Sequence, residues 1–138
     1  NHEYNGEKMK ELRKGFENGL NWDQIRLCAS IKTDFLQIRE IRKGFEEGLS
    51  WEQVALYANT KFSYMQMNLI RTLLKTLPTE QVRTFAKTDY NYLQMLEFVK
   101  GLEQGLTFEQ VKEYANPEYN FVNMMLRRKM ILLGKKEK

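Results

Sequence analysis

The sequence has few of the residues from which catalytic and metal sites are usually built. Its 138 residues include one cysteine, one histidine and two prolines, and they contain no glycine-rich loop of the kind that binds phosphate. One cysteine and one histidine are too few for a zinc site of the usual kind, and a lone cysteine forms no internal disulfide. We therefore expect no metal and no other cofactor.

The few nucleophilic side chains have structural explanations. Ser50 and Ser63 stand where helices are predicted to begin, and Ser30 follows the end of a short predicted helix. Cys28 falls on the apolar face of a predicted helix, and His2 falls in a predicted terminal loop. Because none of these residues has a partner base in its motif, we predict that the protein is not an enzyme.

The chain has no apolar run near the roughly 20 residues that span a bilayer, and it begins with no secretory signal pattern. Since it needs no oxidising compartment, we expect a cytoplasmic protein without membrane association. The formal net charge is +4 and the isoelectric point is about 9.1. This mild excess of positive charge indicates nucleic-acid binding only weakly.

The dominant feature is an internal repeat. Residues 9–20, MKELRKGFENGL, align with residues 38–49, IREIRKGFEEGL, and the same frame recurs at Met67, Met95 and Met124, at spacings of 29, 29, 28 and 29 residues. Such a period is typical of stacked helical repeats. We predict one helical-repeat domain over residues 1–138, with units starting near 9, 38, 67 and 95 and a terminal half-unit from 124.

Each unit is predicted to form a long helix followed by a short one. Both begin at a capping residue with Gln or Asn three positions later, bracketed by apolar residues, as at Asn21/Gln24 and Ser50/Gln53. Alternation typical of strands appears nowhere. The fold class is therefore all-α, an α-solenoid-like stack of 29-residue two-helix repeats. The nine predicted helices lie near residues 6–18, 21–29, 35–47, 51–58, 64–76, 79–86, 92–104, 108–115 and 121–133.

Several positions mark where the helices are expected to stop or deviate. Glycines that can adopt a left-handed conformation are predicted to end the long helices at Gly19, Gly48, Gly105 and Gly134. The third unit is one residue short and has Pro78 where a capping residue is expected. Residues 1–5 match residues 116–120, a predicted loop after a short helix, so we expect a loop at the start and a longer chain of which this is a fragment.

The apolar spacing predicts the core. On the long helices the buried stripe runs through residues such as Met9, Leu12 and Phe16, and on the short helices it includes Trp22, Ile25, Cys28, Trp51, Val54 and Tyr57. Three glycines, Gly15, Gly44 and Gly101, lie inside long helices, where each costs about 1 kcal/mol relative to alanine. We expect them to allow an adjacent helix to approach closely.

One recurring feature is charged. Basic residues follow the second apolar position of each long helix, and stacking would align them as a ladder that could track phosphates. The alternative is a solvated face balanced by Glu17, Glu46, Glu47 and Glu103 one turn later. The candidate binding surface formed by this ladder comprises Arg13, Lys14, Arg42, Lys43, Arg71, Lys100, Arg128 and Lys129.

Two further segments carry a resemblance. Residues 41–49, IRKGFEEGL, with residues 57–59, YAN, and residues 100–106, KGLEQGL, with residues 114–119, YANPEY, resemble repeats of uncharacterised helical-repeat proteins of bacterial mobile elements. The resemblance covers nearly the whole chain, although the third unit departs from it. It implies a bacterial, intracellular setting, and because that family has no established activity it transfers no functional residue.

These observations predict a non-enzymatic scaffold that binds a protein or peptide, because stacked repeats create extended surfaces. The alternative is a nucleic-acid-binding protein that uses the basic ladder, since a short helix, a turn and the next long helix also resemble a helix-turn-helix. Four copies of that unit argue against this alternative. The sequence predicts neither the identity of the partner nor the oligomeric state.

Overall fold

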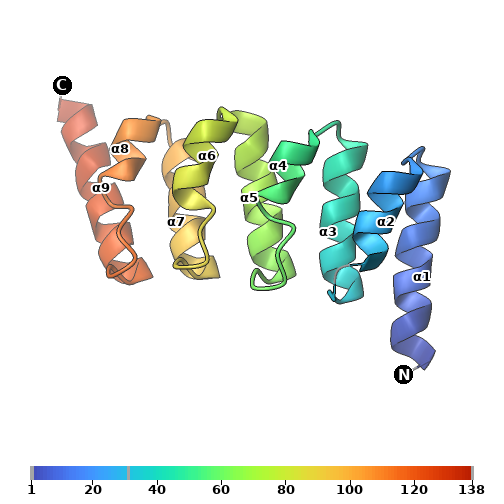
Figure 1. The fold of residues 1–138 in the computed structure, drawn as a ribbon. Coiled ribbons are helices and arrows are strands. Elements are labelled where there is room, and N and C mark those ends of the chain that lie inside the picture. The colour runs from blue at the N-terminus through green and yellow to red at the C-terminus, as the bar shows by residue number, and fades with distance from the viewer. Residues whose placement is uncertain (1, 31, 138) are drawn as a thin grey trace. The chain divides into compact units, whose positions relative to one another are not determined.

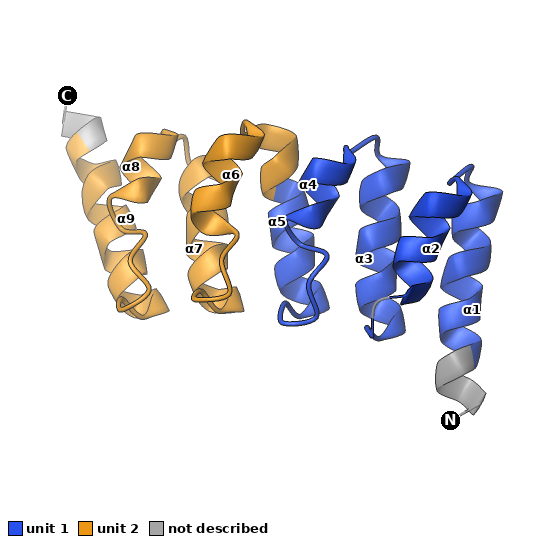
Figure 2. Ribbon diagram, in the orientation of Figure 1, with its two compact units in different colours: residues 1–72 blue, residues 73–138 orange. Residues whose placement is uncertain are grey.

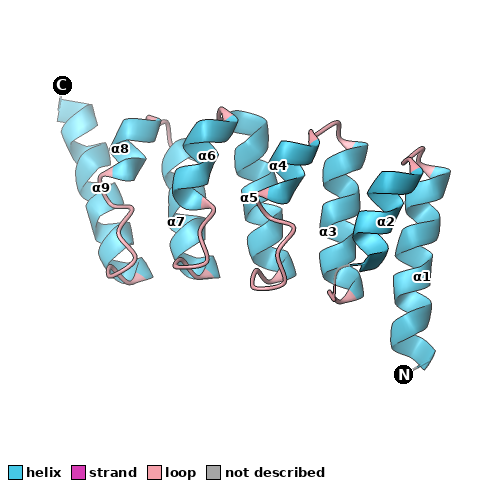
Figure 3. Ribbon diagram, in the orientation of Figure 1, coloured by secondary structure: helices cyan, strands magenta, loops and turns pink. Residues whose placement is uncertain are grey.

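The computed structural model describes the backbone of residues 2–30 and 32–137 and the side chains of residues 6–30 and 32–134. Within these ranges the chain forms nine α-helices and no strand, so the all-α helical stack predicted from the repeat is confirmed (Figures 1 and 3). Long helices alternate with short ones. The helices are α1 (His2–Glu17), α2 (Trp22–Ser30), α3 (Phe35–Glu46), α4 (Trp51–Ala55), α5 (Tyr64–Thr76), α6 (Thr79–Phe85), α7 (Tyr92–Glu103), α8 (Phe108–Lys112) and α9 (Phe121–Glu137).

The chain divides into two compact units, residues 1–72 and residues 73–138, with the boundary inside α5 (Figure 2). In unit 1 the long helices α1 and α3 pack against each other, and the short helix α2 packs against both. In unit 2 the long helices α7 and α9 pack against each other, and α8 packs against α7. Within each compact unit, a long helix therefore contacts the long helix one repeat further along the chain, α1 with α3 and α7 with α9.

The predicted capping signals form as expected. The helices α3, α4, α7 and α8 each begin with a complete capping box, in which the cap side chain accepts from the backbone N–H three residues later and the glutamine there accepts from the cap backbone. The same reciprocal bonds join Asn21 to Gln24 and Ser63 to Gln66. By contrast, Pro78 stands at the N-cap of α6 and makes no side-chain cap bond.

The cap glutamines of two long helices also link successive repeats. Gln37 donates through Nε2 to the carbonyl of Phe62, 2.7 Å away, in the loop before α5. Gln94 makes the equivalent bond to the carbonyl of Tyr119, also at 2.7 Å, and a second one to Pro117 at 3.1 Å. One amide side chain thus caps its own helix and also binds the loop that precedes the long helix of the next repeat.

Three of the four predicted glycine stops are correct. Gly19, Gly48 and Gly105 have φ between 89° and 94°, the left-handed region that favours glycine, and each is followed by a leucine that packs back onto the repeat. The prediction for Gly134 is wrong, because α9 continues through it to Glu137. Lysines follow Gly134 in the sequence, so no apolar residue anchors a turn there.

The expected loop at the start of the chain is also wrong, because α1 already begins at His2. The matching loop near Asn116 contains Pro117 and is held by Gln94. His2 stands where that loop has proline, so the local sequence does not prevent a helix. The side chain of His2 lies outside the described residues.

The glycines inside the long helices do face a close neighbour. A methyl group on Gly44 would overlap the hydroxyl of Tyr57, and one on Gly101 would overlap the hydroxyl of Tyr114. Each hydroxyl donates to a backbone carbonyl of the long helix beside it, to Glu40 and Glu97 respectively, at 2.7 Å. The absence of a side chain therefore lets the tyrosine following a short helix reach the backbone of the long helix.

The predicted core is correct in the middle of each unit and wrong at two kinds of position. Ile38, Ile41 and Phe45 of α3 and Val54 of α4 are buried as expected. On α1, however, Met9 and Phe16 are 59% and 44% exposed, because no helix among the described residues packs on that side. Trp22 and Trp51, the first residues of α2 and α4, are also exposed, whereas Thr79 and Phe108 at the equivalent positions of α6 and α8 are half-buried.

Candidate binding surface

The basic ladder predicted from the repeat is not one surface. Arg42, Arg71 and Arg128 are only 7%, 7% and 4% exposed, and each forms an ion pair between two successive long helices. Of the other members, Arg13, Lys14, Lys100 and Lys129 are exposed and Lys43 is half-buried. Burial of these three arginines contradicts both interpretations of the ladder as one exposed face, the phosphate-tracking one and the solvated one.

The first ion pair joins α1 to α3. The carboxylate of Glu11, 1% exposed, accepts from Arg42 Nη2 at 3.0 Å and from Arg39 Nη2 at 3.1 Å. Arg42 also forms a bidentate pair with Glu46, with Nη1 at 2.7 and 2.8 Å from the two oxygens. Burial alone raises the pKa of Glu11, but the bonds and charges of Arg39 and Arg42 outweigh it and hold this pKa below its ordinary value.

The second and third ion pairs repeat the first one. Glu40 accepts from Arg71 at 3.1 Å, while Arg71 also reaches Glu47 at 2.6 Å. In unit 2, Glu97 accepts from Arg128 Nε at 2.8 Å, and Arg128 Nη1 donates to Gln104 Oε1 at 2.5 Å. We call the pairs Glu11–Arg42, Glu40–Arg71 and Glu97–Arg128 the three rungs.

The rungs were missed at first because only one partner of each was considered, yet the repeat contains a signal for them. Glutamate recurs two residues after the start of a unit, and arginine recurs four residues after the start of the next unit. The glutamate and the arginine are replaced together only once, between the third and fourth repeats, where Leu69 and Val99 occupy the two positions. Leu69 and Val99 are both buried. Such paired change indicates contact between successive repeats.

The exposed basic residues that remain are separated and partly neutralised. Lys14 lies 3.9 Å from Glu11, and Lys100 lies 3.7 Å from Glu97. Arg127, next to Arg128, is exposed and sits over the ring of Tyr119, with 4.1 Å from its guanidinium carbon to the ring centroid. Among the described residues no group of three or more metal-ligating side chains is found.

The buried nucleophiles are held in their protonated forms. Burial raises the pKa of the Cys28 thiol to about 11, so little thiolate is present at neutral pH. Burial likewise raises the pKa values of Tyr57 and Tyr114, whose hydroxyls already donate to backbone carbonyls. These groups contribute to packing and hydrogen bonding.

Unit 1 presents an exposed aromatic surface that the sequence assigned to the core. Trp22 is 69% exposed and meets Phe16 edge-on, with ring centroids 5.0 Å apart, and Trp51 is 46% exposed and packs on Phe45 at 4.9 Å. Both tryptophans begin short helices at the same end of the unit (Figure 1). We call Phe16, Trp22 and Trp51 the tryptophan surface.

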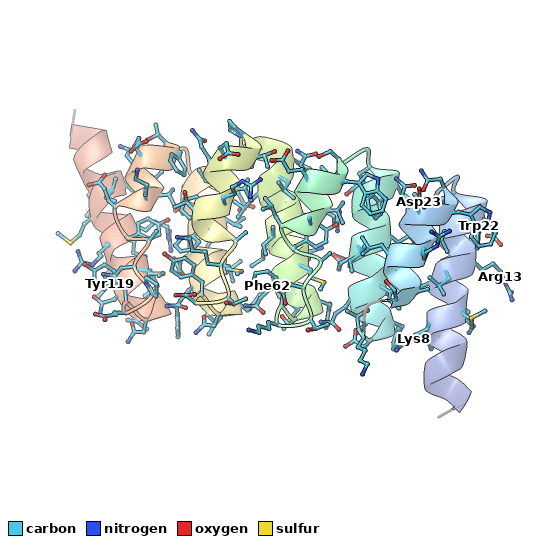
Figure 4. The ribbon with its side chains drawn as sticks, in the orientation of Figure 1. Lys8, Arg13, Trp22, Asp23, Phe62 and Tyr119 are labelled. Carbon is cyan, nitrogen blue, oxygen red and sulfur yellow. The ribbon has the colours of Figure 1, made fainter. Side chains whose placement is uncertain are left out.

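The surroundings of the tryptophan surface are acidic. Asp23 and Glu52 directly follow the two tryptophans, and Glu17 follows Phe16. All three acidic residues are exposed. Figure 4 shows Trp22 and Asp23 together at the start of α2. In unit 2 the equivalent first positions of the short helices are Thr79 and Phe108, so the two tryptophans are particular to unit 1.

No protein-family model, curated protein or solved structure matches the chain. No helix within the described residues is both long enough and apolar enough to cross a membrane.

Proposed function

We propose that this protein is a non-enzymatic helical-repeat scaffold that binds a segment of another protein through the tryptophan surface. The observation that carries the proposal is the exposure of Trp22 and Trp51 at equivalent positions of two successive repeats. Tryptophan dominates binding energy at many protein interfaces, and a large apolar side chain exposed to water twice at one repeat position indicates a contact surface.

The charges around the surface favour a particular kind of partner. Because Glu17, Asp23 and Glu52 are exposed and each directly follows one of the three aromatic residues, a segment that presents apolar side chains flanked by lysine or arginine fits best. A basic side chain of the partner can also lie over an indole ring. The resemblance to repeats of bacterial mobile elements, and the cytoplasmic setting, stay predictions.

The chain's own fluorescence tests this proposal, because Trp22 and Trp51 are its only tryptophans. Partners captured from cells of the source organism, with nuclease present, are purified and titrated against the chain. We expect a blue shift in emission that the Trp22→Phe and Trp51→Phe variants assign to each ring, and loss of capture by the Trp22→Ala/Trp51→Ala variant. The matched control is Tyr64→Ala/Met65→Ala, which removes residues 40% and 41% exposed at the opposite end of unit 1.

Two outcomes would overturn the proposal. The first is capture that the tryptophan double variant retains in full. The second is sub-micromolar binding of single- or double-stranded oligonucleotides that survives at physiological salt, measured by fluorescence anisotropy, since phosphate contacts of scattered surface lysines weaken steeply with salt. Burial of Arg42, Arg71 and Arg128 removes from the surface the arginines on which nucleic-acid binding would depend.

A further inference from the structure

The last long helix of the chain has apolar residues on two opposite sides. On one side of α9, Met124 is fully buried against the rest of unit 2. On the other side, helical spacing places Val122, Leu126, Met130 and Leu133 in one stripe, and they are 42%, 53%, 71% and 60% exposed. We call these four residues the α9 stripe. Its length of three turns matches the stripe through which successive long helices pack.

Two of the four residues in the α9 stripe occupy the repeat positions of an interface that already exists in unit 2. Leu126 corresponds to Glu97 of α7, and Leu133 corresponds to Gln104, which directly follows α7. Those two residues receive Arg128 when α9 packs on α7. Leu126 and Leu133 of the α9 stripe therefore lie at the positions through which a long helix of this fold receives the arginine of the next long helix.

The chemistry of the stripe restricts what can dock there. A glutamate at this position pairs with arginine on the incoming helix in all three rungs, whereas the leucine at position 69 is followed one repeat later by Val99. An arginine facing Leu126 would be buried without a partner, which is costly. The incoming helix should therefore carry an apolar residue where α9 itself carries Arg128.

The charge around the stripe adds a second restriction. Arg127 and Lys129 are exposed beside it, and Lys135 and Lys136 follow in the sequence. A surface pocket of about 200 Å³, lined by Glu113, Arg127, Met130 and Ile131, opens next to it. Basic residues flanking an apolar stripe attract acidic residues on the occupant.

We propose that the α9 stripe is the docking site of an acidic amphipathic α-helix from another protein, with an apolar residue at the position equivalent to Arg128. A second copy of this chain does not fit. The free side of α1 presents Arg13, which would face Leu126, together with Lys10 and Lys14. Pairing α9 with α9 would bring Arg127 and Lys129 of both copies together, and like charges repel.

The test uses helix-stapled peptides with the sequence of residues 92–104, made acidic by Lys100→Glu. One peptide keeps Val99 and the other carries Val99→Arg. We expect the full chain to bind the valine peptide roughly tenfold more tightly than the arginine peptide, and the exposed Leu126→Glu variant to reverse this order, because it recreates the glutamate of a rung. Fluorescence anisotropy measures both affinities, and circular dichroism verifies that the variant stays folded.

Two controls separate this proposal from the tryptophan surface. Met9→Glu places the same charge on a residue 59% exposed on α1 and should change neither affinity. Trp22→Ala/Trp51→Ala should also leave peptide binding unchanged. Failure of both peptides to saturate the chain, or an unchanged order with Leu126→Glu, contradicts the proposal. So does sedimentation of the wild-type chain as a dimer that Leu126→Glu dissociates, because the occupant would then be a second copy.

Discussion

The helices α3 and α5 occupy the same place in successive repeats but differ at two buried positions, which are glutamate and glycine in α3 and leucine in α5. The first carries Glu40 and Gly44 and is followed by Tyr57, whereas the second carries Leu69 and Leu73 and is followed by Phe85. All six residues are buried. The three positions change together because glycine admits the tyrosine hydroxyl to the backbone, while leucine supplies volume where phenylalanine brings no hydroxyl.

The comparison teaches that α3 and α5 each carry a matched set of residues, whereas α1 combines Glu11 and Gly15 with Cys28, and Gly15 there faces Ile25. α7 carries the polar set, Glu97 and Gly101 followed by Tyr114, and it receives Arg128. A polar set requires an arginine from the next unit, because a buried carboxylate without a partner is costly. An apolar set requires an apolar residue at that position of the next repeat. This difference would keep successive repeats in the correct order, as buried polar pairs do in coiled coils.

The largest expected effect comes from breaking a rung on one side only. Glu97→Ala leaves the guanidinium of Arg128 buried without its carboxylate, and we expect it to lower the free energy of unfolding by about 3–5 kcal/mol. Glu97→Leu/Arg128→Val gives the two positions of the rung the residues that the sequence has at Leu69 and Val99. The free energy of unfolding of this double variant, measured in urea, should lie within about 1 kcal/mol of the wild-type value. A double variant as unstable as Glu97→Ala would contradict the inference that a polar set and an apolar set can replace each other.

The stability contributed by the Glu11–Arg42 rung should depend on pH. Because the pKa of Glu11 is held below its ordinary value of 4.5 in the folded state, its ionised form stabilises the fold above that value, and this contribution is lost as pH falls through the lower folded-state pKa. At neutral pH, Glu11→Gln should cost about 1.5–3 kcal/mol by weakening bonds to Arg39 and Arg42. The difference between variant and wild type should shrink in acid. A difference that stays constant from neutral pH to acid would exclude a charge-dependent rung.

A smaller effect is expected where glycine faces tyrosine. Gly101→Ala gains about 1 kcal/mol of helix propensity but places its methyl group on the Tyr114 hydroxyl, so we expect a net loss of about 1–2 kcal/mol. Adding Tyr114→Phe should recover most of this loss. Gly6→Ala is the matched control, because nothing lies within 4 Å of the added carbon and the change should stabilise α1. If thermal unfolding shows equal effects at both glycines, the close contact is not what selects glycine.

Much of the fold could be predicted from the sequence because the repeat presents each local signal several times. The capping boxes, the left-handed glycines and the period all depend on residues within a few positions of one another, so they are readable without a structure. The two errors at the chain ends, around His2 and Gly134, arose from extending the repeat pattern to positions that lack its supporting neighbours, namely a proline and an anchoring leucine.

The candidate sites were harder to predict because burial depends on packing between repeats. Amphipathic spacing places Trp22 and Trp51 on the apolar stripe, but it does not show that both side chains remain exposed to solvent. Likewise, Arg42 reads as a surface residue until Glu11, 31 residues earlier, is placed beside it. Aligning the repeats and comparing pairs of positions would have revealed the rungs.

The smallest expected effect concerns the start of α6 in the apolar third unit. Pro78 offers neither a side-chain acceptor nor a backbone N–H, so Gln81 cannot complete a capping box there. Pro78→Ser supplies both groups. A cap contributes about 1 kcal/mol, and loss of the rigid proline costs about 0.4–1 kcal/mol through the unfolded state, so we expect a net gain of at most a few tenths of a kcal/mol.

Ser50→Ala, which removes an existing cap from α4, should instead cost about 1 kcal/mol. Urea denaturation of both variants, with Gln81→Ala added to Pro78→Ser, separates the contribution of the new cap from that of the lost proline. The added change should remove the gain from the new cap. A Pro78→Ser chain clearly less stable than wild type would show that the proline stabilises this turn by more than its effect on the unfolded chain.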